Sequence, residues 1–495
     1  MEQNNERGWY AAFKAKDARF DGRFFIGVSS TGIYCRPVCR AKLPGPEHCR
    51  FYPTAAAAEQ AGYRPCLLCR PELAPGISLT DATATLAHRA AILLEENCST
   101  GQSLPELAAR LGYTDRHLRR AFTNEYHVSP AQYLQTCRLL LAKNLLTDSN
   151  LSALDVAMVA GFGSLRRFND LFRKQYRLSP TALRKASLGA REPQSDIRLT
   201  LGYRPPYRWQ PLLDFLAGRA ISGVECVRGG EYARSVRLLT RQNKPIFGWI
   251  RVGHLPHKNA LRLALSLSLL PVLPQVLSRV RHLFDLSCDP MATAEILSSM
   301  NELRPNLFVP GTRLPGCFDS FELAVRAVLG QQITVKAAST LASRLVGAYG
   351  TSVQTDIPEL THAFPAPEDI LSLDGEIANH LGPLGITSAR ASTIRELALY
   401  FSENGTAFDR CAAPESEIRK LTGMRGIGSW TAQYIAMRAM GWTDAFLETD
   451  VAIKKALAPR TPKEMLVLSE AWRPWRSYAV IGLWDSLRDV GCKSL

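Results

Sequence analysis

The fold of the second half of the chain is decided by Leu421–Lys455, LTGMRGIGSWTAQYIAMRAMGWTDAFLETDVAIKK. Gly426-Ile427-Gly428 lies between two segments of helical periodicity, and this arrangement predicts a helix–hairpin–helix. The two glycines would let backbone N–H groups at the start of the second helix approach a phosphate. Asp450 follows 22 residues after Gly428 in an otherwise apolar context. A hairpin alone is a weak signal, because many proteins use it only to hold DNA, but the carboxylate adds a candidate for chemistry.

Sequence blocks on both sides of this stretch resemble the helix–hairpin–helix DNA glycosylases, and most closely the AlkA-type 3-methyladenine DNA glycosylases (glycosylase II). The blocks are YRPPYRWQPLLDFLAGRAISGVE (203–225), LPGCFDSFELAVRAVLGQ (314–331) and WRPWRSYAVIGLW (472–484). The resemblance covers residues 199–490 and implies a mixed α/β domain over 195–285 with a helical glycosylase domain over 286–495. It implies hydrolysis of the N-glycosyl bond of alkylated purines of the 3-methyladenine or 7-methylguanine type.

The same resemblance assigns the residues of the expected active site. It makes Asp450 the catalytic carboxylate, whose charge would stabilise the oxocarbenium-like sugar as the flipped base leaves. It assigns four aromatic residues to the base pocket: Phe215, Trp430, Tyr434 and Trp484. Electron-rich rings suit bases that methylation at N3 or N7 has made cationic, and that charge also makes the base a good leaving group. The alternative for any single tryptophan is plain core packing.

Several positions refine the expected mechanism. Glycosylases that also cut the strand carry a Schiff-base lysine just after the hairpin glycines, where this chain has Trp430, so we expect a monofunctional enzyme that leaves an abasic site. Only Cys492 follows Asp450, so no four-cysteine iron–sulfur cluster is expected there. The resemblance also implies that the hairpin carbonyls of Thr422, Met424 and Ile427 hold a monovalent cation.

Three departures from the glycosylase pattern bear on the substrate range rather than on the reaction class. Gln332 stands where the family inserts an apolar wedge into the duplex, Val451 replaces an aromatic residue beside Asp450, and Glu448-Thr449 stand where Pro-Asp would be. Gln332, Gly426 and Gly428 are the DNA contacts that we expect in this half.

Cysteines cluster near the other end of the chain, where five of the twelve fall between residues 35 and 69. Cys35-x3-Cys39 and Cys66-x2-Cys69 supply four soft thiolates in two close pairs, which suits one tetrahedral Zn²⁺ ion. These spacings in a chain without a signal segment indicate a metal site rather than disulfides. The alternative is a purely structural zinc ribbon.

Residues 7–76 resemble the N-terminal domain of the Ada family of alkylation-response regulators. The match rests on the Thr-Gly-Ile-Tyr-Cys-Arg-Pro block at 31–37, on Phe51-Tyr52 and on the Gly-Tyr-Arg-Pro-Cys block at 62–66. The resemblance implies a zinc domain over residues 1–77 in which Cys35 irreversibly takes a methyl group from a methylphosphotriester. Cys49 fits no ligand position. No Pro-Cys-His-Arg block occurs in the chain, so the thiol that repairs O6-alkylguanine is not expected.

An internal repeat lies between these two regions. Residues 107–130 recur in outline as residues 156–180, each with a helix, a Gly-aromatic turn, a basic helix and Ser-Pro. This order predicts two helix-turn-helix units, and it resembles the AraC-type DNA-binding domain, expected here over residues 78–188. The alternative is a helical bundle with a solvated basic face. The side chains expected to reach DNA are Arg116, Arg119, Arg120, Arg166, Arg167 and Asn169.

Composition agrees with a DNA-binding protein of several domains. The chain has 495 residues, is 46% hydrophobic and carries a net charge of +15, which favours a polyanionic partner. Residues 1–190 carry a net +9 and residues 191–495 a net +6, so the first part is the more basic per residue. The first ten residues lack a basic segment with an apolar core, and the longest apolar stretch, Leu263–Ser278, contains two prolines. We therefore expect a cytoplasmic, nucleoid-associated protein without a membrane span.

These observations predict a multidomain, mainly helical protein with α+β parts, in which a methylphosphotriester-sensing transcription activator is fused to an alkylpurine DNA glycosylase. The expected partners are double-stranded DNA and RNA polymerase, and the expected state is a monomer. The main alternative is a transcription regulator whose glycosylase half binds damaged DNA without catalysis.

Overall fold

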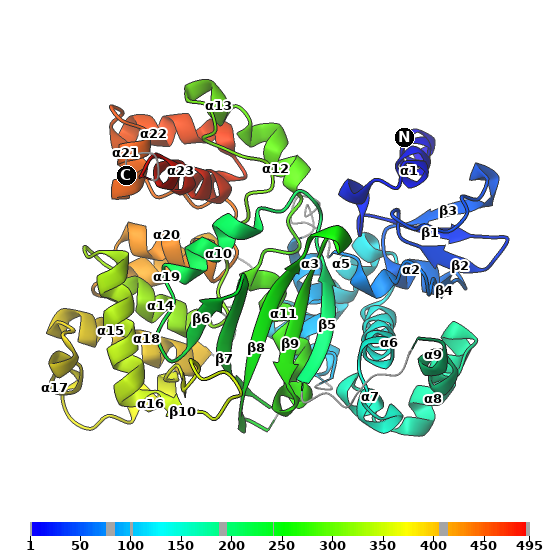
Figure 1. Cartoon of the computed structure of the whole chain (residues 1–495), viewed down its shortest axis with the longest axis horizontal. Helices are drawn as coiled ribbons and strands as arrows, with labels where there is room; N and C mark the ends of the chain where they lie inside the picture. Colours follow the sequence, from blue (N-terminus) through cyan, green and yellow to red (C-terminus); the bar gives the residue numbers. More distant parts are fainter. Residues whose placement is uncertain are drawn as a thin grey trace.

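The computed structural model describes residues 2–75, 85–99, 102–187, 196–240, 242–404 and 414–491. Its elements form a small sheet with two helices, a group of helices, a five-stranded sheet and a larger group of helices (Figure 1). The predicted class, multidomain and mainly α with α+β parts, is confirmed. Within the described residues, no helix is long and apolar enough to cross a membrane.

The N-terminal unit is a four-stranded sheet in the order β3-β1-β2-β4 with helices beside it. Its elements are α1 (Glu2–Lys14), β1 (Phe25–Val28), β2 (Ile33–Cys35), β3 (Cys49–Tyr52), α2 (Ala55–Gln60) and β4 (Arg64–Pro65). Strands β2 and β4 run parallel, with Tyr34 opposite Pro65. Strand β2 ends at Cys35, and Cys66 directly follows the last residue of β4, so this register brings the two cysteines side by side.

Seven helices follow, and two pairs of them repeat the same local structure. They are α3 (Thr85–Glu96), α4 (Leu104–Arg110), α5 (Asp115–Tyr126), α6 (Pro130–Asp148), α7 (Ala153–Val159), α8 (Leu165–Tyr176) and α9 (Pro180–Ser187). Gly112 and Gly161 turn the chain between the paired helices with φ of +77° and +80°, values that disfavour side chains. Thr114 and Ser164 then cap α5 and α8 by accepting a backbone N–H. The repeat read from the sequence is therefore a structural repeat.

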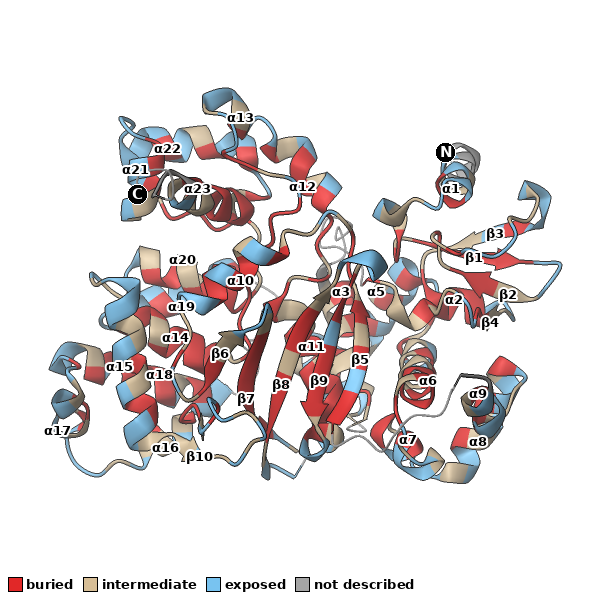
Figure 2. Cartoon of the chain, in the orientation of Figure 1, coloured by how far each residue is buried: buried red, intermediate tan, exposed pale blue. Residues whose placement is uncertain are grey.

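The central sheet is antiparallel throughout, in the order β5-β9-β8-β7-β6. Its strands are β5 (Asp196–Gly202), β6 (Glu225–Arg228), β7 (Glu231–Leu239), β8 (Pro245–Leu255) and β9 (Ala260–Ser266). Strands β7 and β8 form an antiparallel hairpin. Helix α10 (Trp209–Ala217) packs on β6 and β7, and α11 (Leu273–Leu283) continues the chain beyond β9. Figure 2 shows these strands largely buried.

The remaining helices surround α10 and one end of the sheet. They are α12 (Pro290–Leu297), α13 (Met300–Leu303), α14 (Ser320–Leu329), α15 (Val335–Tyr349), α16 (Pro367–Leu371), α17 (Ile377–Leu381), α18 (Ser388–Asn404), α19 (Pro414–Gly423), α20 (Ser429–Arg438), α21 (Val451–Ala456), α22 (Pro462–Ser469) and α23 (Arg476–Gly491). A two-stranded sheet, β10 (Thr351–Ser352) and β11 (His362–Ala363), joins them. The predicted hairpin is the α19–α20 connection, and α14 packs against both α18 and α20.

The N-terminal sheet contacts both of its neighbours. Buried Lys143 of α6 forms an ion pair with buried Glu72, which joins the sheet unit to the repeated helices. Arg23 pairs with Asp289, the N-cap of α12, whose side chain is only 1% exposed. Helix α3 also contacts α11. The three parts therefore pack through polar as well as apolar contacts.

Candidate functional site

The carboxylate of Asp450 is held by four N–H groups. As the N-cap of α21, its Oδ1 accepts the backbone N–H groups of Ala452 and Ile453 over 2.9 and 3.0 Å. The indole of Trp484 donates to the same oxygen over 3.1 Å, and the indole of Trp430 donates to Oδ2 over 3.1 Å. These four donors fix the position of both oxygen atoms of the side chain.

The four predicted pocket residues come together beside this carboxylate. Trp430 and Tyr434, one turn apart on α20, stack with centroids 5.2 Å apart and planes at 7°. Tyr434 and Trp484 of α23 lie 6.4 Å apart, while Trp484 and Phe215 of α10 lie 6.2 Å apart with planes at 17°. Three separate helices thus supply one continuous aromatic surface. Val451, the next residue after Asp450, is 80% exposed and leaves the carboxylate open on that side.

Arginine side chains cover part of the aromatic surface, which the sequence did not reveal. Phe215 is only 2% exposed, and the guanidinium carbon of Arg219 lies 3.7 Å from its ring centroid. Arg438 donates to the Tyr434 hydroxyl over 2.7 Å and to the carbonyl groups of Pro315 and Gly316. Although burial opposes ionisation of Tyr434, Arg438 and then Arg219 lower the pKa of its phenol. The surface beside Asp450 therefore combines aromatic rings with guanidinium groups.

The hairpin between α19 and α20 uses its two glycines differently. Gly426 has φ of +88°, and a Cβ there would lie 2.2 Å from Oγ1 of Thr393, so this position requires glycine. Gly428 has an ordinary φ of −86° and nothing within 4 Å of a Cβ. Open space at Gly428, the N-cap of α20, leaves room for a phosphate at the helix N-terminus. Gly426 shapes the turn, and Gly428 keeps it accessible.

Gln332 occupies an exposed turn between α14 and α15 with φ of +55°. Its neighbour Gln331 donates to the Gly426 carbonyl over 2.9 Å and to Thr431 over 3.1 Å, which ties this turn to the hairpin. Gln331 was missed by sequence reasoning, because no motif distinguishes it from Gln332. At the expected cation site, the Met424 carbonyl accepts the N–H of Ile427 over 3.2 Å. The cation at Thr422, Met424 and Ile427 stays a prediction.

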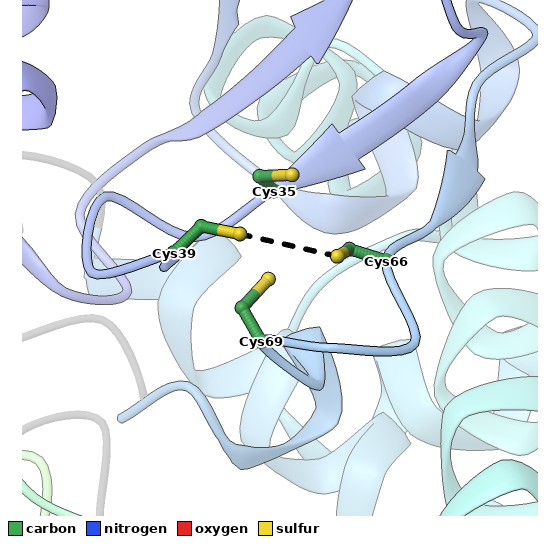
Figure 3. A group of neighbouring side chains, drawn as sticks. All are labelled: Cys35, Cys39, Cys66 and Cys69. Carbon is green, nitrogen blue, oxygen red and sulfur yellow. Dashed lines mark hydrogen bonds between the residues drawn. The ribbon is translucent and has the colours of Figure 1, made fainter. Parts of the chain in front are cut away.

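Four thiols meet at the end of the N-terminal sheet. The sulfur atoms of Cys35, Cys39, Cys66 and Cys69 all lie within 4.8 Å of one another, and those of Cys39 and Cys66 are 4.0 Å apart. Figure 3 shows the four side chains converging from two separate segments, one that starts at the end of β2 and one that follows β4. A tetrahedral zinc ion with Zn–S bonds of about 2.3 Å requires sulfur atoms about 3.8 Å apart. The donor set and its spacing therefore fit Zn²⁺.

The surroundings distinguish the four sulfur atoms. The backbone N–H of Arg36 donates to Sγ of Cys69 over 3.3 Å, and the Arg36 guanidinium pairs with Asp21 and binds the Cys69 carbonyl. Within the described part of the chain, no backbone N–H donates a hydrogen bond to Sγ of Cys35. Cys49 lies outside the cluster on β3, where its thiol donates to the Gly45 carbonyl. Burial, and then Glu47, raise its pKa to about 11.

The side chains predicted to contact promoter DNA lie on the second helix of each repeat. The five arginines are exposed and Asn169 is half-buried: Arg116, Arg119 and Arg120 on α5, and Arg166, Arg167 and Asn169 on α8. Their helices are anchored from the opposite face by buried Leu118, Phe122 and Tyr126 in α5 and by Phe168, Phe172 and Tyr176 in α8. Arg119 is 2.9 Å from Asp115, an ion pair on the exposed surface. Both helices thus present basic faces to solvent.

Comparison with known protein families accounts for most of the chain. The matching family models are the metal binding domain of Ada (8–72), a helix-turn-helix domain (107–186), the AlkA N-terminal domain (198–319) and the HhH-GPD superfamily base excision DNA repair protein (325–475). The Ada model agrees with zinc as the metal of the four-thiol cluster. The order of the four models is the order predicted from the sequence.

Individual proteins match over the same regions. The probable bifunctional transcriptional activator/DNA repair enzyme AlkA of Mycobacterium tuberculosis is 37% identical over 97% of this chain and 96% of its own length. DNA-3-methyladenine glycosylase 2 of Escherichia coli is 36% identical over 58% of this chain and 96% of its own length. The structure of 3-methyladenine DNA-glycosylase from Archaeoglobus fulgidus shares the fold, with a TM-score of 0.50, 19% identity and coverage of 58% of this chain and 98% of that one.

The motifs, the structural repeat and the two sites thus agree with a match that runs nearly end to end in both chains. The chain belongs to the family of bifunctional transcriptional activator/DNA repair enzymes AlkA.

Proposed function

We propose that the second half of the chain is a monofunctional DNA glycosylase that hydrolyses the N-glycosyl bond of alkylated purines. The observation that carries this proposal is the carboxylate of Asp450, fixed by two indole N–H groups next to a wall of aromatic rings. A pocket of this composition can receive a flipped purine, and the anion can stabilise the cationic sugar that forms as the base leaves. A protein that only binds damaged DNA needs no such carboxylate.

The two oxygen atoms of Asp450 accept different numbers of hydrogen bonds. Oδ1 accepts three hydrogen bonds, whereas Oδ2 accepts one, from Trp430. Oδ2 is therefore the oxygen that can face the sugar or orient a water molecule. The bond between C1′ and the base nitrogen breaks with its electron pair going to the base, and a water oxygen then bonds to C1′ and releases one proton to the solvent. With Trp430 at the position of the Schiff-base lysine, water is the nucleophile.

Substitution of Asp450 tests this proposal. Asp450→Asn keeps a side-chain oxygen for the α21 cap but removes the charge, so single-turnover release of 7-methylguanine should fall by about 10²–10³-fold. Glu448→Gln removes a neighbouring charge in the same segment and should leave release unchanged. Unchanged release in Asp450→Asn would refute the assigned mechanism, and no release from 3-methyladenine, 7-methylguanine or hypoxanthine DNA by the unaltered protein would favour the non-catalytic alternative.

We also infer that Cys35 accepts a methyl group from a methylphosphotriester. Sγ of Cys35 attacks the methyl carbon, so an S–C bond forms as the C–O bond breaks, and the phosphodiester anion leaves. Hydrogen bonds to a sulfur anion reduce its reactivity, and Cys69 receives one from Arg36, whereas Cys35 receives none from a described backbone N–H. A bound zinc ion would keep all four thiols deprotonated at neutral pH. The distribution of N–H donors supports Cys35 over Cys69.

Methyl transfer would act as a one-way switch on DNA binding. Four thiolates and one Zn²⁺ carry a formal charge of −2, and methylation of one sulfur leaves −1, which weakens repulsion from the phosphate backbone. After incubation with methylphosphotriester DNA, mass spectrometry of the full chain should show one added methyl group located on Cys35. Cys49→Ser should behave as the unaltered protein. A methyl group on another cysteine, or none, would contradict the assignment to Cys35.

The order of the domains along the chain also supports a proposal about binding partners. We infer a zinc methyl-acceptor domain at 1–77, a promoter-binding domain at 78–188 and a glycosylase at 195–285 plus 286–495. The exposed arginines of α5 and α8 support contact with two successive major grooves of promoter DNA. Activation of transcription would require contact with RNA polymerase, and we propose that the protein acts as a monomer.

A further inference from the structure

The position of Arg219 points to a role in choosing the base. Arg219 lies directly after Gly218, the C-cap of α10, and its guanidinium group covers the face of Phe215. The same guanidinium carbon is 5.9 Å from the ring centroid of Trp484, the residue that donates to Asp450. Arg219 therefore borders the surface on which the flipped base must stack.

The neighbouring arginines are held by partners of their own. Arg438 donates to two backbone carbonyls and to Tyr434, and Arg326 forms ion pairs with Glu225 and Glu322, each over 2.9 Å. No described Asp or Glu side chain forms an ion pair with Arg219. Its Nη1 donates to the Phe215 carbonyl over 3.4 Å, a long hydrogen bond at the end of its own helix, and the Tyr434 hydroxyl is a second hydrogen-bond partner of the side chain. These two contacts do not use all five N–H donors of the guanidinium group, so Arg219 keeps donors that a ligand can use.

Burial lowers the pKa of Arg219 to about 10, which still leaves the group charged at neutral pH. A guanidinium ion beside the stacking surface repels a base that itself carries a positive charge. It attracts a neutral base that presents oxygen or nitrogen acceptors, because its N–H groups can donate charge-assisted hydrogen bonds. The two classes of damaged purine therefore meet opposite electrostatic conditions in this pocket.

We propose that Arg219 is a specificity residue that favours excision of neutral damaged purines with acceptor edges and disfavours purines made cationic by methylation. The inference rests on the proposed glycosylase function and refines its substrate class. A neutral purine leaves with the electron pair of the broken C1′–N9 bond, so negative charge develops on the departing base. A guanidinium donor stabilises that charge without giving up its own proton, and the base then takes a proton from water.

Two substrates and two substitutions test the proposal. The substrates are duplexes that contain hypoxanthine, which is neutral, or 7-methylguanine, which is cationic. Arg219→Met keeps an unbranched side chain but removes the charge and all donors, whereas Arg219→Lys keeps the charge and loses the planar fork. Arg488→Met is the matched control, because Arg488 lies 5.5 Å from the same Phe215 ring but is paired with Asp485 and more exposed.

Single-turnover rates of base release are the measurement. In Arg219→Met, release of hypoxanthine should fall by about tenfold or more, while release of 7-methylguanine should stay constant or rise. Arg219→Lys should recover part of the loss, and Arg488→Met should leave the ratio of the two rates unchanged.

Other outcomes overturn the inference. If the rates for both substrates fall equally in Arg219→Met, Arg219 has a structural role. If both rates stay as they are in the unaltered protein, Arg219 does not select between the bases. Both results leave the proposed glycosylase function intact. Failure of the unaltered protein to release either base would instead refute the glycosylase function itself.

Discussion

The four-thiol cluster and Asp450 both concentrate negative charge in partly buried sites, but they stabilise it by different means. Around Asp450 the protein supplies four N–H donors of its own. In the cluster the sulfur atoms mainly face one another, within 4.8 Å, and the nearest arginine, Arg36, already pairs with Asp21. The comparison shows that the carboxylate site is complete in the polypeptide, whereas the thiol site requires a cation.

The direction of the pKa shift at Cys35 follows from this difference. Hydrogen bonds with the neighbouring thiols of Cys39, Cys66 and Cys69 raise the pKa of Cys35, and burial raises it further. An ion with two positive charges reverses this tendency by binding the thiolate form.

Removal of zinc should produce the largest effect, and only at one of the sites. Structural zinc contributes about 10 kcal/mol or more to folding in small zinc domains, so chelation should unfold the unit that contains β1–β4. Limited proteolysis should then cut within residues 8–72, while release of 7-methylguanine stays within twofold of its initial rate (about the error of such assays). A parallel loss of base release would mean that the two sites are not independent.

Loss of an indole donor should affect the carboxylate site strongly, and unequally for the two tryptophans. Trp430→Phe leaves Oδ2 of Asp450 without its one hydrogen bond, whereas Trp484→Phe leaves Oδ1 with two backbone donors. We expect single-turnover release to fall by about 10–100-fold in Trp430→Phe and by about tenfold or less in Trp484→Phe. The reverse order would show that stacking outweighs the hydrogen bonds.

Substitution of the two hairpin glycines tests how strongly the turn before α20 depends on glycine at each position. Gly426→Ala forces a side chain into a left-handed conformation and against Thr393, so unfolding free energy should fall by about 1–3 kcal/mol. A Cβ at Gly428 would lie in open space, so Gly428→Ala should change the free energy of unfolding by less than about 0.5 kcal/mol. Urea titrations of both variants make the comparison. Equal losses would mean that the turn is not constrained as described.

A buried carboxyl group near the thiol cluster differs from Asp450 because hydroxyl groups rather than N–H groups donate to it. Glu59 accepts hydrogen bonds from the hydroxyl groups of Tyr34 and Thr136, and burial raises its pKa to about 8 despite these bonds and Lys143. Its folded-state pKa exceeds the unfolded value, so the folded state holds the extra proton. The free energy of unfolding should therefore decrease as the pH rises from about 5 to about 8, by at most about 1.4 kcal/mol per pH unit.

Glu59→Gln removes this titration while keeping an oxygen for one hydroxyl donor. Thermal unfolding measured at several pH values should show a flatter profile in the variant than in the unaltered protein. Glu106→Gln, at an exposed position on α4, is the matched control and should keep the original slope. A slope that persists in Glu59→Gln would trace the pH dependence to another group.

The motifs that sequence reasoning recognised are those whose chemistry is encoded over short spacings. Cys35-x3-Cys39 and Cys66-x2-Cys69 specify a metal site because thiol chemistry needs those residues close together, and the structure brings them within 4.8 Å. The repeated Gly-aromatic turns predict paired helices, and both glycines have positive φ. The aromatic residues were identified as a set, but their second task, donating indole hydrogen bonds to Asp450, was not.

What escaped prediction depends on contacts between distant parts of the chain. The Trp484 indole reaches Asp450 across 34 residues, Gln331 reaches Gly426 across 95, and Arg23 reaches Asp289 across 266. No local pattern distinguishes these side chains from others of the same type. Arg219 is four residues from Phe215, yet only the convergence of α10 with α23 shows that it borders the base pocket.

By itself, the sequence predicted the helix–hairpin–helix, the repeated helices and the four clustered thiols, because local periodicity and ligand spacing are properties of short segments, and resemblance to known families pointed to Asp450. Only the tertiary structure decided which oxygen of Asp450 accepts fewer hydrogen bonds and which arginine lies against the aromatic surface. Those features arise where helices from distant segments pack together, since packing fixes the direction of each donor and the place of each charge.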